Sequence, residues 1–525
     1  MKAQNWTRFI VPAALAALAA APVALASEAD LQLPPIDDKI VFSVFGKPIM
    51  GATLMYAGIA VALVGAIFGV FQYSRVNALP THPSMRNVSN IIWETCKSYL
   101  TQQGKFLALL WFLIAGAMVV YFGFLNPIGG GHAAEGAAAA DVPHTSPVMS
   151  VGIVLVCSIL GILGSYGVAW FGIRINTQAN SRTAFASLRG NGLECLSIPL
   201  SAGMSIGMLL VSVELFFMIA IMMFIPSHLV GASFIGFAIG ESLGATVLRI
   251  CGGIFTKIAD IGSDLMKIVF KLPEDDPKNP GVIADCTGDN AGDSVGPTAD
   301  GFETYGVTGV ALIAFLAYAL GGGSGDQKTM CMQLIVWMFT MRALMIITSL
   351  VSYWLTNAWS KASFGSRREF DEEAPLTRLV IVTSIISVIV TYFASHALLG
   401  EIVFNGNKLE NLWWVLATII SLGTAAGALI PEFTKVFTST SSKHVNEVTN
   451  ASAQGGASLN ILSGLVAGNF SAFWMGFLIL VLMAAGWKLS ENPDLALLMP
   501  DAYRSFAAPI FAFGLIAFGF LGMGP

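Results

Sequence analysis

Ten of the chain's 32 acidic residues lie between residues 256 and 305, although long apolar segments flank this stretch on both sides. Five of them form two rows with a step of four residues, Asp260 and Asp264 in the first and Asp285, Asp289 and Asp293 in the second. Residues four apart share one face of a helix, and like charges at this spacing destabilise it. The pattern therefore predicts that a positively charged partner binds along this face.

Divalent metal is the natural partner for such rows, because hard carboxylate oxygens suit Mg²⁺ or Ca²⁺. Mg²⁺ typically binds through one or two carboxylates together with the phosphates of a substrate. Lysines interspersed among the acids suggest that the second component is an anion: Lys257, Lys267, Lys271 and Lys278. The alternative is a solvated acidic loop, which the helical register and the flanking apolar segments disfavour.

The composition restricts the class of protein. The 525 residues are 55% hydrophobic and 11% charged, with a mean hydropathy of +0.72, which excludes a soluble globular protein and indicates a polytopic membrane protein. The net charge of −5 says little, and we expect no nucleic acid partner. The six cysteines lack CxxC spacing and the six histidines are dispersed, so neither a disulfide framework nor a zinc site follows.

The first residues have the features of a secretory signal. Lys2 and Arg8 precede an apolar stretch, and Ala24, Leu25 and Ala26 form a small-residue cleavage site. We therefore predict a signal peptide over residues 1–26; an uncleaved first helix is the alternative.

Eleven further apolar segments each approach the roughly 20 residues that a membrane-spanning helix needs. They lie at 50–73, 106–126, 148–173, 198–225, 229–255, 296–321, 330–356, 378–398, 411–430, 457–487 and 504–525. The sequence thus predicts an all-α polytopic membrane protein with about 11 transmembrane helices.

Lys and Arg are enriched in cytoplasmic loops of membrane proteins. With the N-terminus outside, sixteen fall in inner loops, and only Lys328, Lys408 and Lys488 fall in outer ones. We therefore expect a multi-pass protein of the bacterial inner membrane, with a periplasmic N-terminus and the stretch 256–305 facing the cytoplasm.

Four charged residues fall within the predicted spans: Glu214, Glu241, Arg249 and Arg342. Charges inside a membrane are costly and mark functional paths by default. A purely structural buried ion pair is the alternative for any one of them.

Three motifs in the acidic stretch resemble those of the membrane-integral, ion-pumping inorganic pyrophosphatases. They are DIGSDLMK from Asp260 to Lys267, EDDPKNPGVIAD from Glu274 to Asp285, and GDNAGD from Gly288 to Asp293. Weaker similarity includes NTQANSRT at Asn176–Thr183 and extends over most of residues 27–525, with 256–305 as the catalytic motif region.

Two departures from the family pattern qualify the resemblance. Met266 stands where the family has a glycine, which leaves the role of Lys267 open. Members of the family also continue for several more helices, which carry a second acidic motif. The chain therefore resembles an N-terminal portion, and we expect it to be inactive alone.

The resemblance implies Mg²⁺-dependent hydrolysis of pyrophosphate coupled to ion pumping out of the cytoplasm. Asp260, Asp264 and Asp289 would hold the Mg²⁺–pyrophosphate complex. Glu274 and Asp285 would support the metal shell.

The resemblance also implies catalytic roles for two further residues. Lys257 would contact a phosphate oxygen, and Asp293 would be one of two carboxylates that grip the nucleophilic water.

Arg182, Asp300 and Glu303 match or approximate the family's ion gate. The position of Glu303, three residues after Asp300, is common among sodium pumps of the family, so we expect Na⁺ transport with H⁺ as an additional ion. Transport of H⁺ alone is the alternative. Na⁺ and K⁺ are candidate activators, and the family is homodimeric.

Coupling would follow from one helix that carries Asp289, Asp293, Asp300 and Glu303 from the hydrolytic site to the gate. A secondary cation transporter remains a rival, with the acidic stripe as its transport site. An EF-hand-type calcium loop is disfavoured, because it needs ligands at alternate positions. A non-catalytic relic of the enzyme also stays open.

Overall fold

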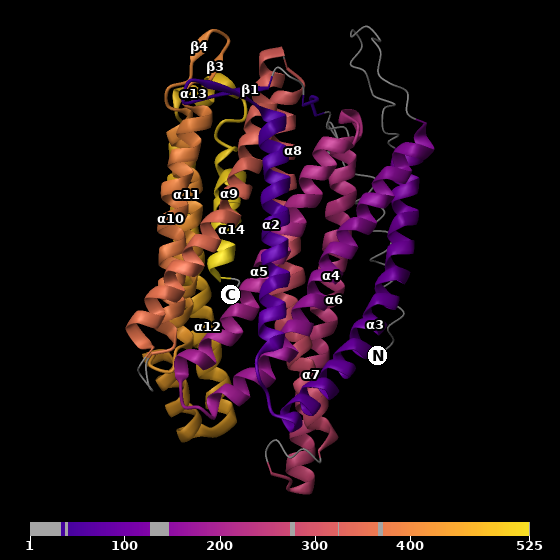
Figure 1. Ribbon diagram of the computed structural model, residues 1–525, viewed down its shortest axis with the longest axis vertical. Coiled ribbons are helices and arrows are strands. Elements are labelled where there is room, and N and C mark those ends of the chain that lie inside the picture. Colours follow the sequence, from indigo (N-terminus) through magenta and orange to yellow (C-terminus); the bar gives the residue numbers. More distant parts are fainter. Residues whose placement is uncertain are drawn as a thin grey trace.

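Long helices make up nearly all of the described chain. The computed structural model describes residues 33–36, 40–125, 146–273, 279–323, 325–365 and 371–523. The predicted signal peptide at 1–26 and Glu274 of the predicted site therefore lie outside the described residues. Most helices stand side by side along the long axis of the molecule (Figure 1).

The helices follow one another along the chain. They are α2 (Gly51–Ala78), α3 (Pro83–Val120), α4 (Pro147–Ser187), α5 (Gly192–Phe224), α6 (Ser227–Phe270), α7 (Pro280–Val295), α8 (Gly301–Leu316), α9 (Gly325–Phe364), α10 (Glu373–Leu399), α11 (Leu412–Thr438), α12 (Lys443–Leu489), α13 (Pro493–Leu498) and α14 (Ala507–Met523). Three π-helical segments extend them, η3 (Tyr121–Leu125), η4 (Gly296–Asp300) and η5 (Ala317–Gly321).

Each of the eleven predicted spans falls on a helix of this list. By length and composition, nine helical stretches of the described residues could cross a membrane, one of which, Leu412–Leu489, covers both α11 and α12. The apolar part of α14, Ala507–Ala517, is shorter. Gly456 divides α12, since its φ of +60° and ψ of −150° are not helical, and the predicted span begins at the next residue.

Two short β-hairpins, which the sequence analysis did not predict, lie at the upper end of the bundle (Figure 1). Strand β1 (Val41–Val44) pairs with β2 (Lys47–Met50), and β3 (Val403–Phe404) pairs with β4 (Asn407–Lys408), both antiparallel. Each turn places two residues at positive φ and ends in glycine, which matches the twist of a two-residue hairpin.

Helices α4 and α6 approach each other through glycines. A Cβ atom at Gly161 would lie 2.8 Å from the backbone nitrogen of Glu241, and one at Gly240 would lie 2.8 Å from the carbonyl carbon of Ser158. Small residues of this kind let membrane helices pack backbone against backbone. The contact fixes α6, which carries half of the candidate site.

Burial differs strongly among the helices. Helix α9 is central: 78% of the residues in its most apolar 18-residue segment are buried. In the most apolar segment of the stretch Leu412–Leu489, which covers α11 and α12, 0% are buried. Gly486 is the one buried residue of α12. Helix α12 therefore lies at the margin of the bundle.

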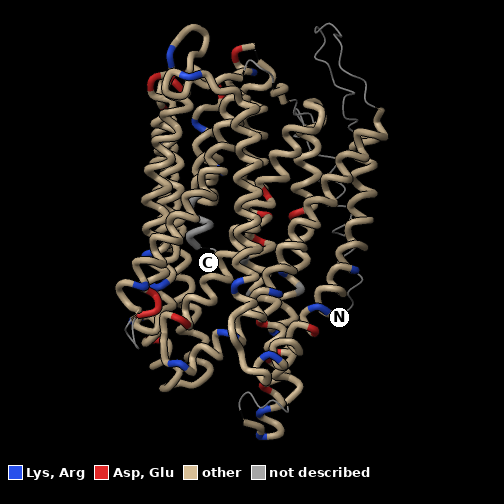
Figure 2. The backbone as a smooth tube through the Cα atoms, in the orientation of Figure 1, with Lys and Arg blue, Asp and Glu red and all other residues tan. Residues whose placement is uncertain are grey.

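Charged residues are unevenly distributed along the molecule. Figure 2 shows Lys and Arg concentrated around the lower end, where α7 lies, and a few acidic positions midway along the central helices. Acidic residues at this depth must be compensated within the protein.

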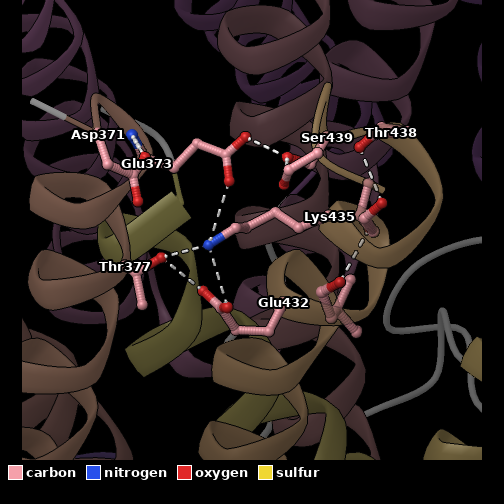
Figure 3. Close-up of polar contacts among 10 residues, drawn as sticks. Asp371, Glu373, Thr377, Glu432, Lys435, Thr438 and Ser439 are labelled. Atoms are coloured by element: carbon pink, nitrogen blue, oxygen red, sulfur yellow. Dashed lines mark hydrogen bonds and ion pairs between the residues drawn. The ribbon is translucent and has the colours of Figure 1, made fainter. Parts of the chain in front are cut away.

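A polar network ties α10 to α11 (Figure 3). The Lys435 ammonium lies 2.8 Å from the Thr377 hydroxyl, 3.3 Å from Glu432 and 3.5 Å from Glu373. Thr377 donates to Glu432, and Ser439 donates to Glu373. Because these groups are about one third exposed, each pair contributes little alone, but together they fix how the two helix ends meet.

We expect the α4–α6 contact to be sensitive to a single methyl group. Replacing Gly161→Ala should lower the free energy of unfolding by about 1–3 kcal/mol, because the added Cβ overlaps the backbone of α6. Gly167→Ala on the same helix is the matched control: nothing lies within 4 Å of its Cβ, so the change should be neutral or stabilising. Thermal unfolding in detergent measures both. Equal melting temperatures for the two variants would contradict the proposed packing.

Candidate functional site

The site begins where α6 and α7 touch. A Cβ atom at Gly288 would lie 2.9 Å from the Cα of Thr256, and one at Gly292 would lie 2.6 Å from the Thr256 hydroxyl. That hydroxyl donates to the carbonyl oxygen of Gly288 across 2.7 Å. The two glycines of GDNAGD thus serve helix contact, since a larger side chain at either would separate α7 from α6.

Described residues define the end of α6 and the start of α7. Helix α6 ends at Phe270, and the next residue, Lys271, has a left-handed φ of +53°. Asn279 begins α7 by accepting a hydrogen bond from the backbone of Gly281 at 2.9 Å, and its amide donates to the carbonyl of Ser263 on α6. The α6–α7 pair projects below the neighbouring helices (Figure 1).

This contact brings the two predicted carboxylate rows together. Asp260 and Asp264 on α6 lie close enough to Asp285 for their charges to act on it, as does Asp289 on α7. Lys267 forms an ion pair with Asp264 at 3.0 Å and also acts on Asp285. The sequence could not place the rows face to face, because nothing in the residues between the two rows sets the register of one helix against the other.

The crowding changes the acidity of Asp285. Burial raises the pKa of its carboxyl, the charges of Asp289, Asp260 and Asp264 raise it further, and Lys267 acts in the opposite direction. A cation that neutralises the neighbouring carboxylates would therefore stabilise the charged form of Asp285.

Among the described residues, no three His, Cys, Asp or Glu side chains are close enough to hold a metal ion by themselves. The donor chemistry nevertheless fits Mg²⁺, which needs only one or two carboxylates when phosphate oxygens and water complete its shell. The site thus fits a metal bound together with a phosphate ligand better than a protein-only metal cage.

Two predicted catalytic residues lie on the same helices. Lys257 is exposed on α6, three residues before Asp260. Asp293 lies in α7, but its side chain is outside the described part of the structure. Their predicted roles toward phosphate and water remain predictions.

Helix α4 supports α7 through amides. The amide of Asn176 donates to the Ser294 hydroxyl at 2.7 Å, and that of Asn180 donates to Asn290 at 2.9 Å. Both asparagines belong to the NTQANSRT motif, one turn apart on α4. From the sequence this motif indicated only a family resemblance; the spacing of four residues between the asparagines is the one local signal that both face the same neighbouring helix.

Beyond α7 the helical path continues through η4 into α8. Asp300, at the end of η4, forms an ion pair with Arg249 of α6. Glu303, in the first turn of α8, is half-buried and lies near enough to Glu241 of α6 for the two charges to interact. The acidic residues after α7 therefore continue to lie along α6. The expected single α-helix is interrupted by the π-helical segment η4.

The third predicted gate residue lies elsewhere. Arg182 is buried on α4, and its guanidinium donates to Gln178, to Ser181 and to both oxygens of Asn77, at the end of α2. The expected neighbour of Asp300 is replaced by Arg249. The structure thus brings Asp300 and Glu303 to α6 and leaves Arg182 as a link between α4 and α2.

Residues 63–525 match the family model described as "Inorganic H+ pyrophosphatase". This chain belongs to that family. Several curated proteins share sequence with this chain beyond the acidic motifs.

A K(+)-insensitive pyrophosphate-energized proton pump of Chlorobaculum tepidum is 56% identical over 469 residues, which cover 89% of this chain and 58% of the relative. A protein of the same description from Caldanaerobacter subterraneus is 28% identical, over 84% of this chain and 59% of the relative. A putative K(+)-stimulated pyrophosphate-energized sodium pump of Clostridium tetani is 32% identical, over 59% of this chain and 41% of the relative. The chain thus spans a little over half the length of the first two relatives.

The hydroxyl of Thr256 should hold α7 in place. Thr256→Val keeps the shape but removes the bond to Gly288, so we expect a loss of about 0.5–1.5 kcal/mol in stability and faster amide hydrogen exchange within α7. Thr449→Val is the control, because that hydroxyl bonds only within its own helix, to Val445. Unchanged exchange in α7 would contradict the role assigned to Thr256.

The raised pKa of Asp285 predicts a pH-dependent effect of its replacement. The folded state disfavours the charged carboxylate, so without Mg²⁺ the variant Asp285→Asn should be more stable than the wild type at neutral pH. The advantage should vanish below the ordinary Asp pKa of about 3.9. Melting temperatures across pH test this, and an advantage that grew on acidification would contradict it.

Proposed function

We propose that this protein takes part in hydrolysing inorganic pyrophosphate and uses the reaction to pump protons out of the cytoplasm. The observation that carries the proposal is the meeting of the carboxylates of α6 and α7 around Asp285. Pyrophosphate is small and highly charged, so a site for it must combine bound cations with positioned water. Membership of the family supports the same activity.

The comparisons favour H⁺ over the sodium transport that the position of Glu303 suggested. Two of the relatives named above are described as K(+)-insensitive proton pumps, including the one at 56% identity. The sodium pump relative is described as putative and is less similar. We therefore propose H⁺ as the transported ion and activity without K⁺.

Mg²⁺ is the cofactor that the donor set fits. Asp260, Asp264 and Asp289 would hold it, with Asp285 in support, and it would neutralise phosphate charge during hydrolysis. Lys257 is exposed on the same face of α6 and offers an ammonium to a phosphate oxygen.

Coupling has a physical route in the helical path from α7 through η4 to α8. A ligand that draws Asp289 toward α6 would also displace Asp300 and Glu303, because α7, η4 and α8 form one continuous helical segment. Because π-helical turns break the regular hydrogen-bond pattern, η4 is the place where such a shift is absorbed most easily.

The orientation follows from charge. Lys and Arg gather at the end of the bundle that holds α7 (Figure 2), which supports a cytoplasmic α6–α7 site and a periplasmic opposite end. We also propose that the protein acts as a homodimer in a bacterial inner membrane, as the family resemblance implies.

The function is tested in inverted membrane vesicles from cells that naturally produce this protein. Pyrophosphate with Mg²⁺ should acidify the vesicle interior without Na⁺ or K⁺. Asp289→Asn should lower the apparent Mg²⁺ affinity at least about 10-fold. Asp326→Asn is the control: this exposed aspartate begins α9, separated from α7 by the length of α8. Pyrophosphate-driven uptake of Na⁺ without acidification would overturn the choice of ion, and no response to pyrophosphate would overturn the function.

A further inference from the structure

Three charged side chains lie in the middle of the bundle, away from the α6–α7 site. Glu214 on α5, Glu241 on α6 and Arg342 on α9 are each 0% exposed. Acidic positions at this depth are visible midway along the helices in Figure 2. Such groups cost so much free energy inside a membrane that they are expected to have a function.

The two carboxylates are neighbours across a glycine of α8. A Cβ atom at Gly306 would lie 2.5 Å from Oε1 of Glu214 and closer still to Oε2 of Glu241. Because both distances start from one point, the two oxygens must lie near each other. A glycine at this position leaves the space that the carboxylates occupy.

Arg342 of α9 contacts α8 at Gly309, one turn beyond Gly306. A Cβ atom at Gly309 would lie 2.5 Å from its Nη2 atom. The guanidinium donates to the carbonyl oxygen of Tyr305 at 2.6 Å, contacts the Met218 sulfur at 2.9 Å and lies 4.0 Å from the centre of the Tyr305 ring. Its hydrogen bonds therefore go to groups other than the carboxylates.

The two carboxylates receive no hydrogen bond from a donor group. Their four oxygens are buried without such a bond, and the buried hydroxyl of Tyr305, within electrostatic reach of Glu214, also has none. The two carboxyl groups lie within hydrogen-bonding reach of each other, and the charge of Arg342 acts on both. Unpartnered polar atoms at this depth are among the costliest groups in a fold. Such an arrangement calls for a ligand that both carboxylates can share.

The charges specify that ligand. The pair carries two negative charges against the single positive charge of Arg342, and Glu303 adds a further nearby carboxylate on α8. Two adjacent carboxylates in a low-dielectric site cannot both ionise, and they commonly share one proton. A proton needs no coordination shell. Na⁺ would need several oxygens around it, and the guanidinium of Arg342 already brings a positive charge to one side of the pair.

We propose that Glu214 and Glu241 share a single exchangeable proton and form a station of the proton path within the membrane. Glu303 precedes Gly306 by three residues on α8, so the acidic row that starts on α7 leads to this pair. The station's place on a transport path rests on the proposed function; the shared proton does not.

Infrared spectroscopy of the whole chain in lipid vesicles tests the shared proton. At neutral pH without Na⁺ we expect the carbonyl band of one protonated carboxylic acid, shifted in D₂O and by ¹³C-labelled glutamate. The label shows in the wild-type chain that a glutamate carries the proton, even if a variant fails to fold; a band that the label leaves unshifted would overturn the proposal. Absence of the band, or its loss on adding Na⁺, would overturn the proposal, the second outcome by making Na⁺ the occupant.

The variants Glu214→Gln and Glu241→Gln should each remove or shift this band. Glu447→Gln, at an exposed position of α12, should leave it unchanged. A band that persists unshifted in both buried variants would assign the proton to another residue and overturn the proposal.

The station is tested in the pyrophosphate-energised vesicles described above. Each buried variant should lose at least 90% of the acidification, whereas Glu447→Gln should retain it. Full acidification by both variants would remove the pair from the path. If wild-type vesicles fail to respond to pyrophosphate while the infrared band is present, the proposed function fails and the shared proton stands.

Discussion

The contact between the backbones of α6 and α7 determines most of what the candidate site can do. Gly288 and Gly292 present no side chain, so α7 lies directly against Thr256 of α6. At that separation the carboxylates of the two helices act on one another, which a spacing set by larger side chains would prevent. The amide ladder from α4 then fixes α7 from its other side.

Charges within the bundle are compensated in three different ways. Asp300 is paired with Arg249, and both remain partly exposed, so this pair carries a modest cost. The buried Arg182 is bound by neutral oxygens, which satisfy its hydrogen bonds without cancelling its charge. Glu214 and Glu241 receive no hydrogen bond from a donor group; they lie beside each other, and the charge of Arg342 acts on both without an ion pair. The third case therefore differs physically from the other two, and it lies furthest along the acidic row.

Helix α8 connects these regions. It starts at the π-helical turn that follows α7, carries Glu303 toward α6, and presents Gly306 and Gly309 to the buried carboxylates and Arg342. Under the proposed coupling, a movement of α7 reaches groups that respond strongly to small displacements, because electrostatic energies rise steeply in a low dielectric.

The sequence by itself determined the class of fold and the apolar part of each long helix, because hydrophobic length is a local property that needs no partner. It did not give the polar extensions of α3 and α6 beyond those apolar parts. It also identified the acidic rows and the four intramembrane charges, from spacing and composition alone. Only the tertiary structure decided which groups meet: Asp300 with Arg249 and not Arg182, the asparagines of α4 with α7, and Glu214 beside Glu241. These pairings depend on helix rotation and on close approach at glycines, and neither is encoded in the residues of a single helix.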